Sequence, residues 1–241
     1  MKYREIKNKY QPKSNIFADK YCMFFSPFLT KIFLKTKVTP NEITIMMILS
    51  GVIGAVLFAF KSIPIKIIGV VFIHLWYILD CTDGEVARAK QHFSRFGKEI
   101  DYSAHILNHP LFNIAFAISL LSLNRYNNTM VLFLTIIVIF MDSILRNIYA
   151  FEVIYELKMM EHVQVSSTQN RGNIVKESIK FVVAQFLQYP NYALIFPIVF
   201  LFDFYKNTNI GIVYLILIVI VKVPMIVRLY LKWVFRIKDI R

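Results

Sequence analysis

The chain has 241 residues, of which 57% are hydrophobic, and its mean hydropathy is +0.54. This composition excludes a single soluble domain and predicts an integral membrane protein. A net charge of +13 would suggest nucleic acid as the partner of a soluble protein, but here the Lys and Arg residues cluster at the ends of apolar segments and accompany no nucleic-acid-reading motif. They predict contact with the anionic headgroups of a lipid bilayer instead.

The N-terminal segment, residues 1–38, is predicted to be a basic cytoplasmic segment that contains an amphipathic helix from Tyr21 to Lys35. The helix is too short and too mixed in polarity to span a bilayer, so it is expected to lie in the membrane interface. The alternative is a surface helix packed on the bundle. Its apolar stripe consists of Phe24, Phe25, Phe28, Leu29, Ile32 and Phe33, with Ser26, Thr30 and Lys31 on the opposite face.

The two cysteines, Cys22 and Cys81, have a spacing that suggests neither a metal-binding knot nor a disulfide framework. Cys81 is expected to be a small packing residue. The first twenty residues contain Lys and Arg throughout and no apolar core, so they do not form a secretory signal.

The first membrane span is predicted to begin at the sequence Thr-Pro-Asn-Glu, residues 39–42, and to end near residue 60. Thr39 can cap the helix, proline suits the first helical position, and Glu42 completes the reciprocal capping pattern. Gly51 and Gly54 would let a neighbouring helix come close.

Five further spans follow in the sequence. The second runs from about residue 65 into an acidic stretch that begins at Asp80, and Pro110 predicts a kink in the third. The polar and charged segment 152–180 predicts a loop, which a continuation of the fourth helix can precede. The third to sixth spans are predicted near residues 101–122, 130–150, 181–204 and 209–227. The fold class is therefore an all-α integral membrane protein with six transmembrane helices preceded by an amphipathic interfacial helix. The six-span domain covers 39–230, and a basic cytoplasmic tail covers 231–241.

The orientation follows from the charges that flank the spans. Six spans place both termini on one side, and 22 of the 28 Lys and Arg residues fall on that side. The positive-inside rule therefore predicts that the termini and the acidic hairpin face the cytoplasm, across the cytoplasmic (inner) membrane.

The acidic stretch from Asp80 to His105 predicts a helical hairpin with charged side chains at membrane depth. Residues three, four, seven and eight positions after Asp80 share its helix face, and Asp101 shares a face with His105. The charged and small residues concerned are Asp80, Asp83, Gly84, Ala87, Arg88, Asp101 and His105. The hairpin thus carries three carboxylates, an arginine and a histidine inward.

Three interpretations of this hairpin are open. A carboxylate inside a membrane helix costs about 2.5 to 3.5 kcal/mol, so the three must be offset by cations or water. Carboxylate oxygens suit Mg²⁺ or Mn²⁺, and neither a zinc set nor an EF-hand loop is present in the sequence. The alternatives are a structural salt-bridge network and an ion or proton pathway. Gly84 argues against both alternatives, because a glycine directly after the second carboxylate suggests that a ligand approaches the backbone.

The same residues carry a family resemblance. The pattern Asp80-x-x-Asp83-Gly84-x-x-Ala87-Arg88, followed after eight residues by Gly97-x-x-x-Asp101, resembles the signature of the CDP-alcohol phosphotransferases. The resemblance covers the hairpin in detail and extends to the six-span layout and the opening of the first span. The last third of the chain resembles the family only in being apolar.

The resemblance implies an enzyme that cleaves the diphosphate of a CDP-alcohol, passes the alcohol-bearing phosphoryl group to an acceptor hydroxyl and releases CMP. By position, Asp80, Asp83 and Asp101 would hold Mg²⁺ or Mn²⁺ against the diphosphate. Gly84 and Gly97 would leave room for the nucleotide, Ala87 would pack beside it, and Arg88 would contact the diphosphate. The donor expected from the resemblance is CDP-diacylglycerol, in phospholipid headgroup synthesis. The alternatives are a soluble CDP-alcohol used on a lipid or glycan acceptor, or a non-catalytic or ion-conducting membrane protein. The family also implies a homodimer.

One position departs from the family signature, which has a fourth Asp where this chain has His105. Histidine can take a proton from the acceptor hydroxyl at cytoplasmic pH, since its unperturbed pKa is about 6.5. It is a poorer Mg²⁺ ligand than Asp, so a second Mg²⁺ site is not expected, although Mn²⁺ tolerates imidazole better. The alternative is that His105 only packs beside a site without its base.

The acceptor alcohol is expected to be bound by cations near the cytoplasmic face. Arg146, with Asp142 one helical turn before it, lies inside a span, where an arginine usually points at a functional group. The alternative for Arg146 is a salt bridge to Asp142. Arg171 and Lys176 are further candidates in the loop after the fourth span.

Overall fold

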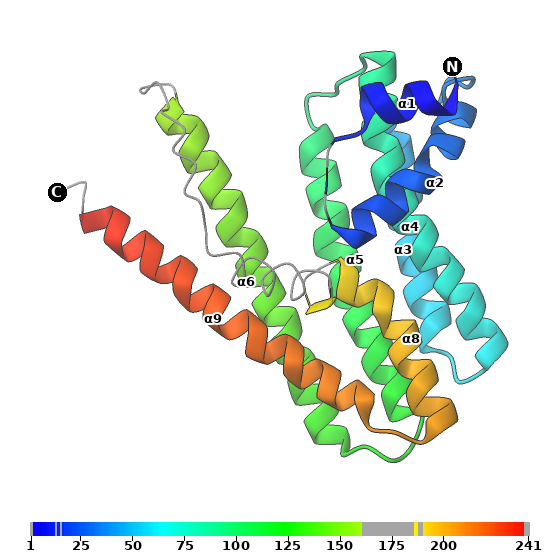
Figure 1. Ribbon diagram of the computed structural model, residues 1–241, viewed down its shortest axis with the longest axis vertical. Helices are drawn as coiled ribbons and strands as arrows, with labels where there is room; N and C mark the ends of the chain where they lie inside the picture. The colour runs from blue at the N-terminus through cyan, green and yellow to red at the C-terminus, as the bar shows by residue number, and fades with distance from the viewer. Residues whose placement is uncertain (1, 13, 15, 161–185, 188–189, 239–241) are drawn as a thin grey trace.

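The computed structural model describes residues 2–12, 14, 16–160, 186–187 and 190–238, and the regular structure of these residues is helical throughout (Figure 1). The N-terminal helices α1 and α2 precede the helices of the bundle. In chain order the helices are α1 (Tyr3–Tyr10), α2 (Phe17–Phe33), α3 (Pro40–Ala59), α4 (Ile63–Lys90), α5 (Gly97–Leu121), α6 (Asn128–Met160), α8 (Asn191–Lys206) and α9 (Ile210–Lys238).

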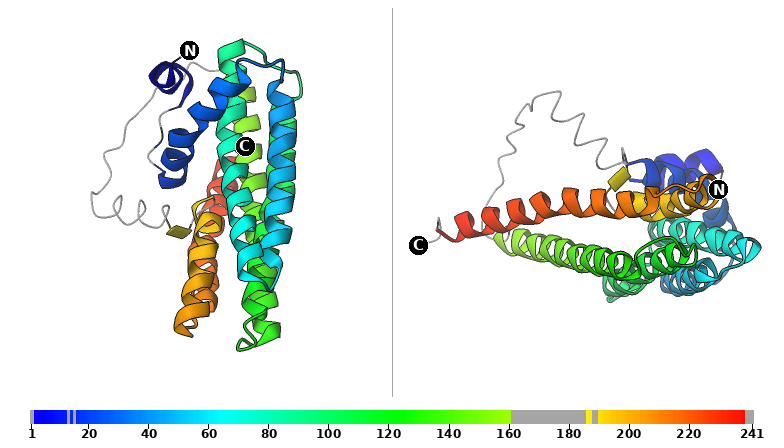
Figure 2. Two further views of the ribbon diagram at one scale, coloured as in Figure 1. Left: turned by 90° about the vertical axis from the view of Figure 1, so that its right-hand side faces the viewer. Right: turned by 90° about the horizontal axis from the view of Figure 1, so that it is seen from below.

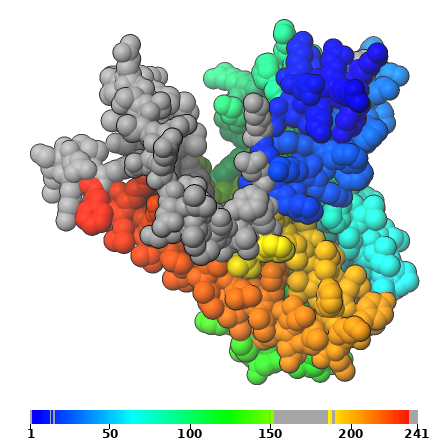
Figure 3. Space-filling view, in the orientation of Figure 1, coloured from blue at the N-terminus to red at the C-terminus, as the bar shows by residue number. Residues whose placement is uncertain are grey.

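The long helices run up and down between two ends. The connections α3–α4, α5–α6 and α8–α9 lie at one end, and the α4–α5 turn lies at the other end together with α1 (Figure 1). Helices α3, α4 and α5 pack together, whereas α6 and α9 run side by side (Figure 2) and diverge from that group towards the α1 end (Figure 1). Helices α1 and α2 cover much of α4 on one face (Figure 3).

Five of the described helices are long and apolar enough to cross a membrane, namely α3, α4, α5, residues Asn128–Ile148 of α6 and residues Ile210–Phe235 of α9. The prediction of an α-helical membrane protein is confirmed. The predicted fifth span, 181–204, falls partly outside the described residues, and most of its described part belongs to α8, which has 16 residues. Helix α6 continues to Met160, in line with the alternative of a prolonged fourth helix.

The amphipathic helix α2 begins at Phe17, four residues before the predicted start, and α1 was not predicted at all. The phenylalanine stripe of α2 is exposed, with 53% of the Phe24 surface and 54% of the Phe28 surface accessible, as expected of an interfacial helix. Its polar face is not solvated, however, because Ser26 and Thr30 are completely buried against α4. The small polar face of α2 therefore packs on the bundle while its aromatic face points outward.

The expectation for the cysteines was wrong. Cys22 of α2 and Cys81 of α4 form a disulfide in this structure, with Cα atoms 6.4 Å apart. The sequence spacing gave no indication of this pair, because the two residues meet only when α2 docks along α4.

The predicted start of the first span is confirmed by the capping of α3. The Thr39 hydroxyl accepts a hydrogen bond from the Glu42 backbone N–H at 3.3 Å, and the Glu42 carboxylate accepts one from the Thr39 N–H at 2.7 Å. The close approach predicted for Gly54 is also present, since a Cβ built there would lie 2.8 Å from the backbone nitrogen of Ile73 on α4. Gly69 makes the reciprocal contact from α4.

A buried carboxylate also organises the opposite end of the bundle. Asp203, near the end of α8, accepts hydrogen bonds from the backbone N–H groups of Ile210 and Gly211 at 2.8 and 2.7 Å, and so caps the start of α9. The Tyr126 hydroxyl also donates to Asp203, and burial together with this bond raises the pKa of the Tyr126 phenol. These bonds tie the α5–α6 connection to the α8–α9 connection.

Gly69→Ala is expected to destabilise the α3–α4 pair. The added methyl group would lie 2.5 Å from the backbone nitrogen of Phe58, which cannot move without shifting α3. Overpacking of this kind costs about 1–3 kcal/mol, more than the helix propensity that alanine gains. Thermal unfolding of the protein in detergent measures the effect, with Val71→Ala on the exposed face of α4 as the control. An unchanged midpoint would contradict this packing.

Candidate active site

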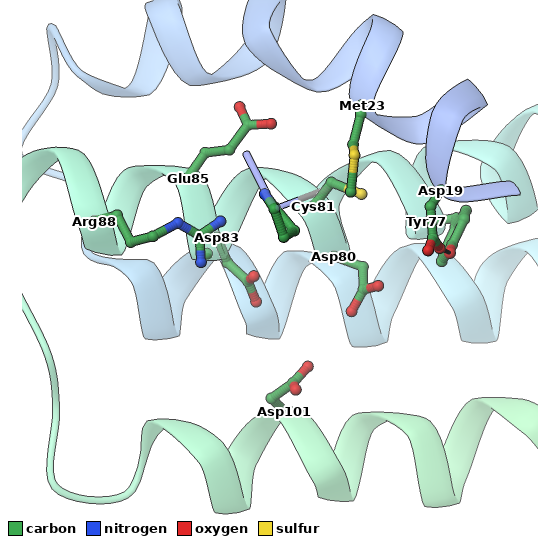
Figure 4. A pocket seen from close by; sticks show the side chains of 11 residues that line it. Asp19, Met23, Tyr77, Asp80, Cys81, Asp83, Glu85, Arg88 and Asp101 are labelled. Atoms are coloured by element: carbon green, nitrogen blue, oxygen red, sulfur yellow. Dashed lines mark hydrogen bonds between the residues drawn. The ribbon is translucent and has the colours of Figure 1, made fainter. Parts of the chain in front are cut away.

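The acidic residues of the α4–α5 hairpin meet in one pocket of about 320 Å³. Asp80 and Asp83 come from α4, and Asp101 faces them from the start of α5 (Figure 4). The N-terminal segment closes the pocket from the other side. The lining residues are Pro12, Asp19, Met23, Tyr77, Asp80, Cys81, Asp83, Gly84, Glu85, Arg88 and Asp101.

The ligand atoms of Asp80, Asp101 and His105 all lie within 4.8 Å of one another. His105 Nε2 is 3.2 Å from Asp80 Oδ1, across the hairpin. It is 3.5 Å from Asp101 Oδ1, because His105 lies one turn after Asp101 on α5. Two carboxylates and one imidazole form a donor set that fits a divalent cation such as Mg²⁺ or Mn²⁺. The group is therefore compatible with a divalent cation, but it contains His105 in place of Asp83, which the sequence predicted as the third ligand.

Asp83 lines the same pocket but has a different partner. The Thr44 hydroxyl of α3 donates a hydrogen bond of 2.6 Å to Asp83 Oδ2. Thr44 is buried in the first part of α3. The first span therefore contributes directly to the orientation of one acidic residue of the hairpin.

The predicted nucleotide-binding residues divide into two groups. Gly84 and Arg88 line the pocket, and a Cβ at Gly84 would lie 3.2 Å from the Arg88 guanidinium. Arg88 Nε donates a 2.5 Å hydrogen bond to the carbonyl oxygen of Tyr10. Ala87 and Gly97 are outside the pocket lining, and Gly97 lies against the hairpin turn.

His105 is connected to α6 through a second histidine. His105 Nδ1 lies 3.1 Å from His109 Nε2, and Arg146 Nη2 lies 2.6 Å from His109 Nδ1. The Trp76 ring packs edge-on against both imidazoles, with centroids 5.7 and 6.1 Å away. The imidazole of His105 is therefore held from two sides.

The alternative interpretation of Arg146 was a salt bridge to Asp142, but Asp142 pairs with other residues. It forms an ion pair with Lys222 of α9 and accepts a hydrogen bond from the hydroxyl of Tyr192 on α8. These contacts join α6, α8 and α9. Arg146 instead contacts His109, so the two residues that were predicted together serve different neighbours. Arg171 and Lys176 lie outside the described residues.

The sequence prediction missed Glu85, which lies within the family pattern and is 1% exposed. Its carboxylate accepts hydrogen bonds from Gln11 Nε2 at 2.7 Å, from the Thr30 hydroxyl at 2.5 Å and from the Ser26 hydroxyl. The sequence did contain a hint of this contact. Ser26 and Thr30 share one face of an otherwise aromatic helix, and their hydroxyls can supply the donors that a buried carboxylate requires. The pairing of that face with Glu85 was not predictable from spacing.

The fold and the site together define an α-helical membrane protein whose acidic pocket is compatible with a divalent cation. A model of the CDP-alcohol phosphatidyltransferase family matches residues 37–235, and the chain belongs to this family. It is therefore a transferase of phospholipid biosynthesis, with a CDP-alcohol as donor and an alcohol as acceptor. Members of the family depend on divalent metals in general. The comparison with curated proteins gave no match.

Glu85→Ala is expected to loosen the N-terminal segment from the bundle. The change removes the acceptor of three hydrogen bonds and leaves buried hydroxyl and amide donors without it, at about 1–3 kcal/mol. Limited proteolysis measures the loosening of the N-terminal segment as faster cleavage within residues 1–36. Glu99→Ala, an exposed carboxylate in the first turn of α5, is the control. Equal cleavage rates in the two variants would show that Glu85 does not hold the segment.

Proposed function

We propose that the protein transfers a substituted phosphoryl group from CDP-diacylglycerol to an acceptor alcohol, with release of CMP, in phospholipid headgroup synthesis. The observation that carries this proposal is the gathering of Asp80, Asp83, Asp101, Gly84 and Arg88 around one pocket. A lipid donor is supported by the outward aromatic face of α2, since this helix also lines the pocket with Met23 and so connects it to the bilayer.

The proposed membrane arrangement has six spans in the cytoplasmic membrane, with α8 and the residues before it as the fifth. Both termini and the active site would face the cytoplasm, as the distribution of Lys and Arg indicates. A homodimer and the domain boundaries at residues 38 and 230 stay predictions.

Asp80, Asp83 and Asp101 are the proposed metal ligands. A bound Mg²⁺ or Mn²⁺ would neutralise charge on the diphosphate oxygens and fix their orientation. Thr44 orients Asp83 through its hydrogen bond, and His105 contacts Asp80 and Asp101.

Gly84, Ala87, Arg88 and Gly97 are the proposed residues of the nucleotide and diphosphate end. Gly84 leaves the backbone of α4 accessible from the pocket, and Arg88 supplies the cation there. The Tyr10 carbonyl holds Arg88 Nε, while the remaining guanidinium N–H groups are donors that suit phosphate oxygens. Ala87 and Gly97 would act by allowing close packing around this end.

His105 is the proposed general base. It would take the proton from the acceptor hydroxyl as the acceptor oxygen forms a bond to the phosphorus that bears the alcohol. The bond from that phosphorus to the bridging oxygen breaks, and CMP leaves with the electron pair. The support for this role is that His105 Nε2 points at the acidic cluster, while His109 and Trp76 hold the ring.

Arg146 and Asp142 are proposed to serve the acceptor end. Arg146 contacts His109, which in turn contacts His105, so Arg146 would position the base as well as contribute positive charge near the acceptor. Asp142 is engaged by Lys222 and Tyr192, and it would act by holding α6 against α8 and α9.

Asp83→Asn tests the proposed function. The change keeps the shape of the side chain and removes the charge that would bind the metal, so CMP release should fall by more than about 100-fold, beyond the 10- to 100-fold typical of residues that only support metal ligands. The assay supplies CDP-diacylglycerol in mixed micelles with Mg²⁺ or Mn²⁺ and a panel of alcohols, with Glu99→Gln as the control. CMP release from soluble CDP-alcohols alone would assign the donor to that class. Absence of CMP from every donor with the wild-type protein would refute the transferase proposal.

His105→Ala and His105→Asp together test the base. Loss of a general base lowers the rate by about 10²–10⁴-fold, so we expect a fall of this size in kcat for His105→Ala. His105→Asp restores the residue of the family signature and should recover much of the rate, with the acid limb of the pH–rate profile moved to lower pH because carboxylates titrate below imidazoles. An unchanged kcat for His105→Ala would remove His105 from this role.

A further inference from the structure

Part of the pocket wall comes from residues that precede the family match. The family match begins at residue 37, but Pro12, Asp19 and Met23 line the pocket from the N-terminal segment. This segment is fixed against the bundle at several points. Glu85 binds its polar face, and the backbone N–H of Ala18 donates a 2.9 Å hydrogen bond to the Asn191 side chain of α8. The segment is thus a built wall of the site that lies before the residues matched by the family model.

Asp19 is the charged residue that this wall brings to the pocket. The Tyr77 hydroxyl donates a hydrogen bond to Asp19 Oδ1, and the Ser14 hydroxyl donates one to Oδ2. A carboxylate can accept about four hydrogen bonds, so these two leave capacity for a ligand. Asp19 is also distinct from the group formed by Asp80, Asp101 and His105, whose ligand atoms lie together.

The position of Asp19 follows from the order of residues along α4. Tyr77, Asp80, Gly84 and Arg88 succeed one another at about one helical turn each, so they form a row along the pocket. Figure 4 shows Arg88 near one end of this row, Asp80 in the middle, and Asp19 beside Tyr77 at the other end. The nucleotide end is at Gly84 and Arg88, and the Asp19 end is therefore on the far side of the acidic centre.

The chemistry of the transfer assigns that far side. The attacking and leaving oxygens lie roughly in line through the phosphorus, so the acceptor must approach from the side opposite CMP. The end of the pocket that is opposite Gly84 and Arg88 carries Asp19 and Tyr77. An acceptor alcohol there would meet a carboxylate and a phenol oxygen.

We propose that Asp19 is a specificity-determining residue that accepts hydrogen bonds from the O–H or N–H groups of the acceptor alcohol and disfavours phosphorylated acceptors. This inference rests on the proposed function. A carboxylate attracts hydroxyl and ammonium donors, whereas a phosphate placed beside Asp19 would be repelled by the like charge of this carboxylate. Arg146 reaches His109 from α6 and is not part of the pocket lining, so its charge lies beside the proposed base and does not offset the charge of Asp19.

Asp19→Asn is the first test, with myo-inositol, glycerol, L-serine and sn-glycerol 3-phosphate as acceptors. For the acceptor that the wild type uses, we expect KM to rise by about tenfold or more, the size of a lost charge-assisted hydrogen bond. The KM for the CDP-alcohol donor should stay within about twofold, since Asp19 is remote from Gly84 and Arg88. Preferential use of sn-glycerol 3-phosphate by the wild type would overturn the proposal, as would equal changes in both KM values.

Two further variants separate specificity from folding. Glu5→Gln removes a carboxylate from the same N-terminal segment, on α1 and away from the pocket lining, and should leave both KM values unchanged. Tyr77→Phe removes one hydrogen bond to Asp19 while keeping the ring that packs in the core, and should raise the acceptor KM by less than Asp19→Asn does. A fall in the thermal midpoint of Asp19→Asn with unaltered acceptor KM would assign Asp19 a structural role only.

Binding of the acceptor in the absence of donor gives a readout that is independent of turnover. Isothermal titration of the same four alcohols should show weaker binding to Asp19→Asn than to the wild type, and equal binding would overturn the inference. Failure of the proposed function has a different signature, namely no CMP from any donor with the wild-type protein. A difference in alcohol binding between the two proteins would support the assignment of Asp19 even in that case.

Discussion

The carboxylates that α4 carries into an apolar bundle are the constraint on which the other contacts depend. An unpaired carboxylate at this depth is costly, so each must find a partner on another helix. Asp80 contacts His105 of α5, Asp83 accepts a hydrogen bond from Thr44 of α3, and Glu85 is surrounded by donors of the N-terminal segment. The requirement for partners therefore fixes three elements around residues 80–85 of α4, most of which also line the pocket.

The N-terminal segment has two roles because its faces differ. The aromatic face of α2 is exposed and suits the membrane interface, while the face with Ser26 and Thr30 binds Glu85. The disulfide between Cys22 and Cys81 joins the same two helices. Helix α2 thus presents an exposed aromatic face and also forms a wall of the pocket.

Most helices could be predicted because their signals are local. Thr39 and Glu42 cap α3 within one turn, and long apolar runs define the spans. The prediction failed where a helix depends on distant contacts. Helix α1 is short and polar, and the first turn of α2 is held in part by the hydrogen bond from Ala18 to Asn191, which is 173 residues away. Neither the partner of Asp142 nor the disulfide had a local signal.

The sequence by itself determined the family, the hairpin and the candidate metal residues, because fixed spacing on a helix puts Asp80, Asp83 and Arg88 on one face whatever surrounds it. Only the tertiary structure decided which groups share the pocket with them. It brought His105 to Asp80 across the hairpin and Asp19 to Tyr77 from α2. The physical reason is that helical periodicity fixes the direction of a side chain within its own helix, whereas its partners depend on how separate helices pack.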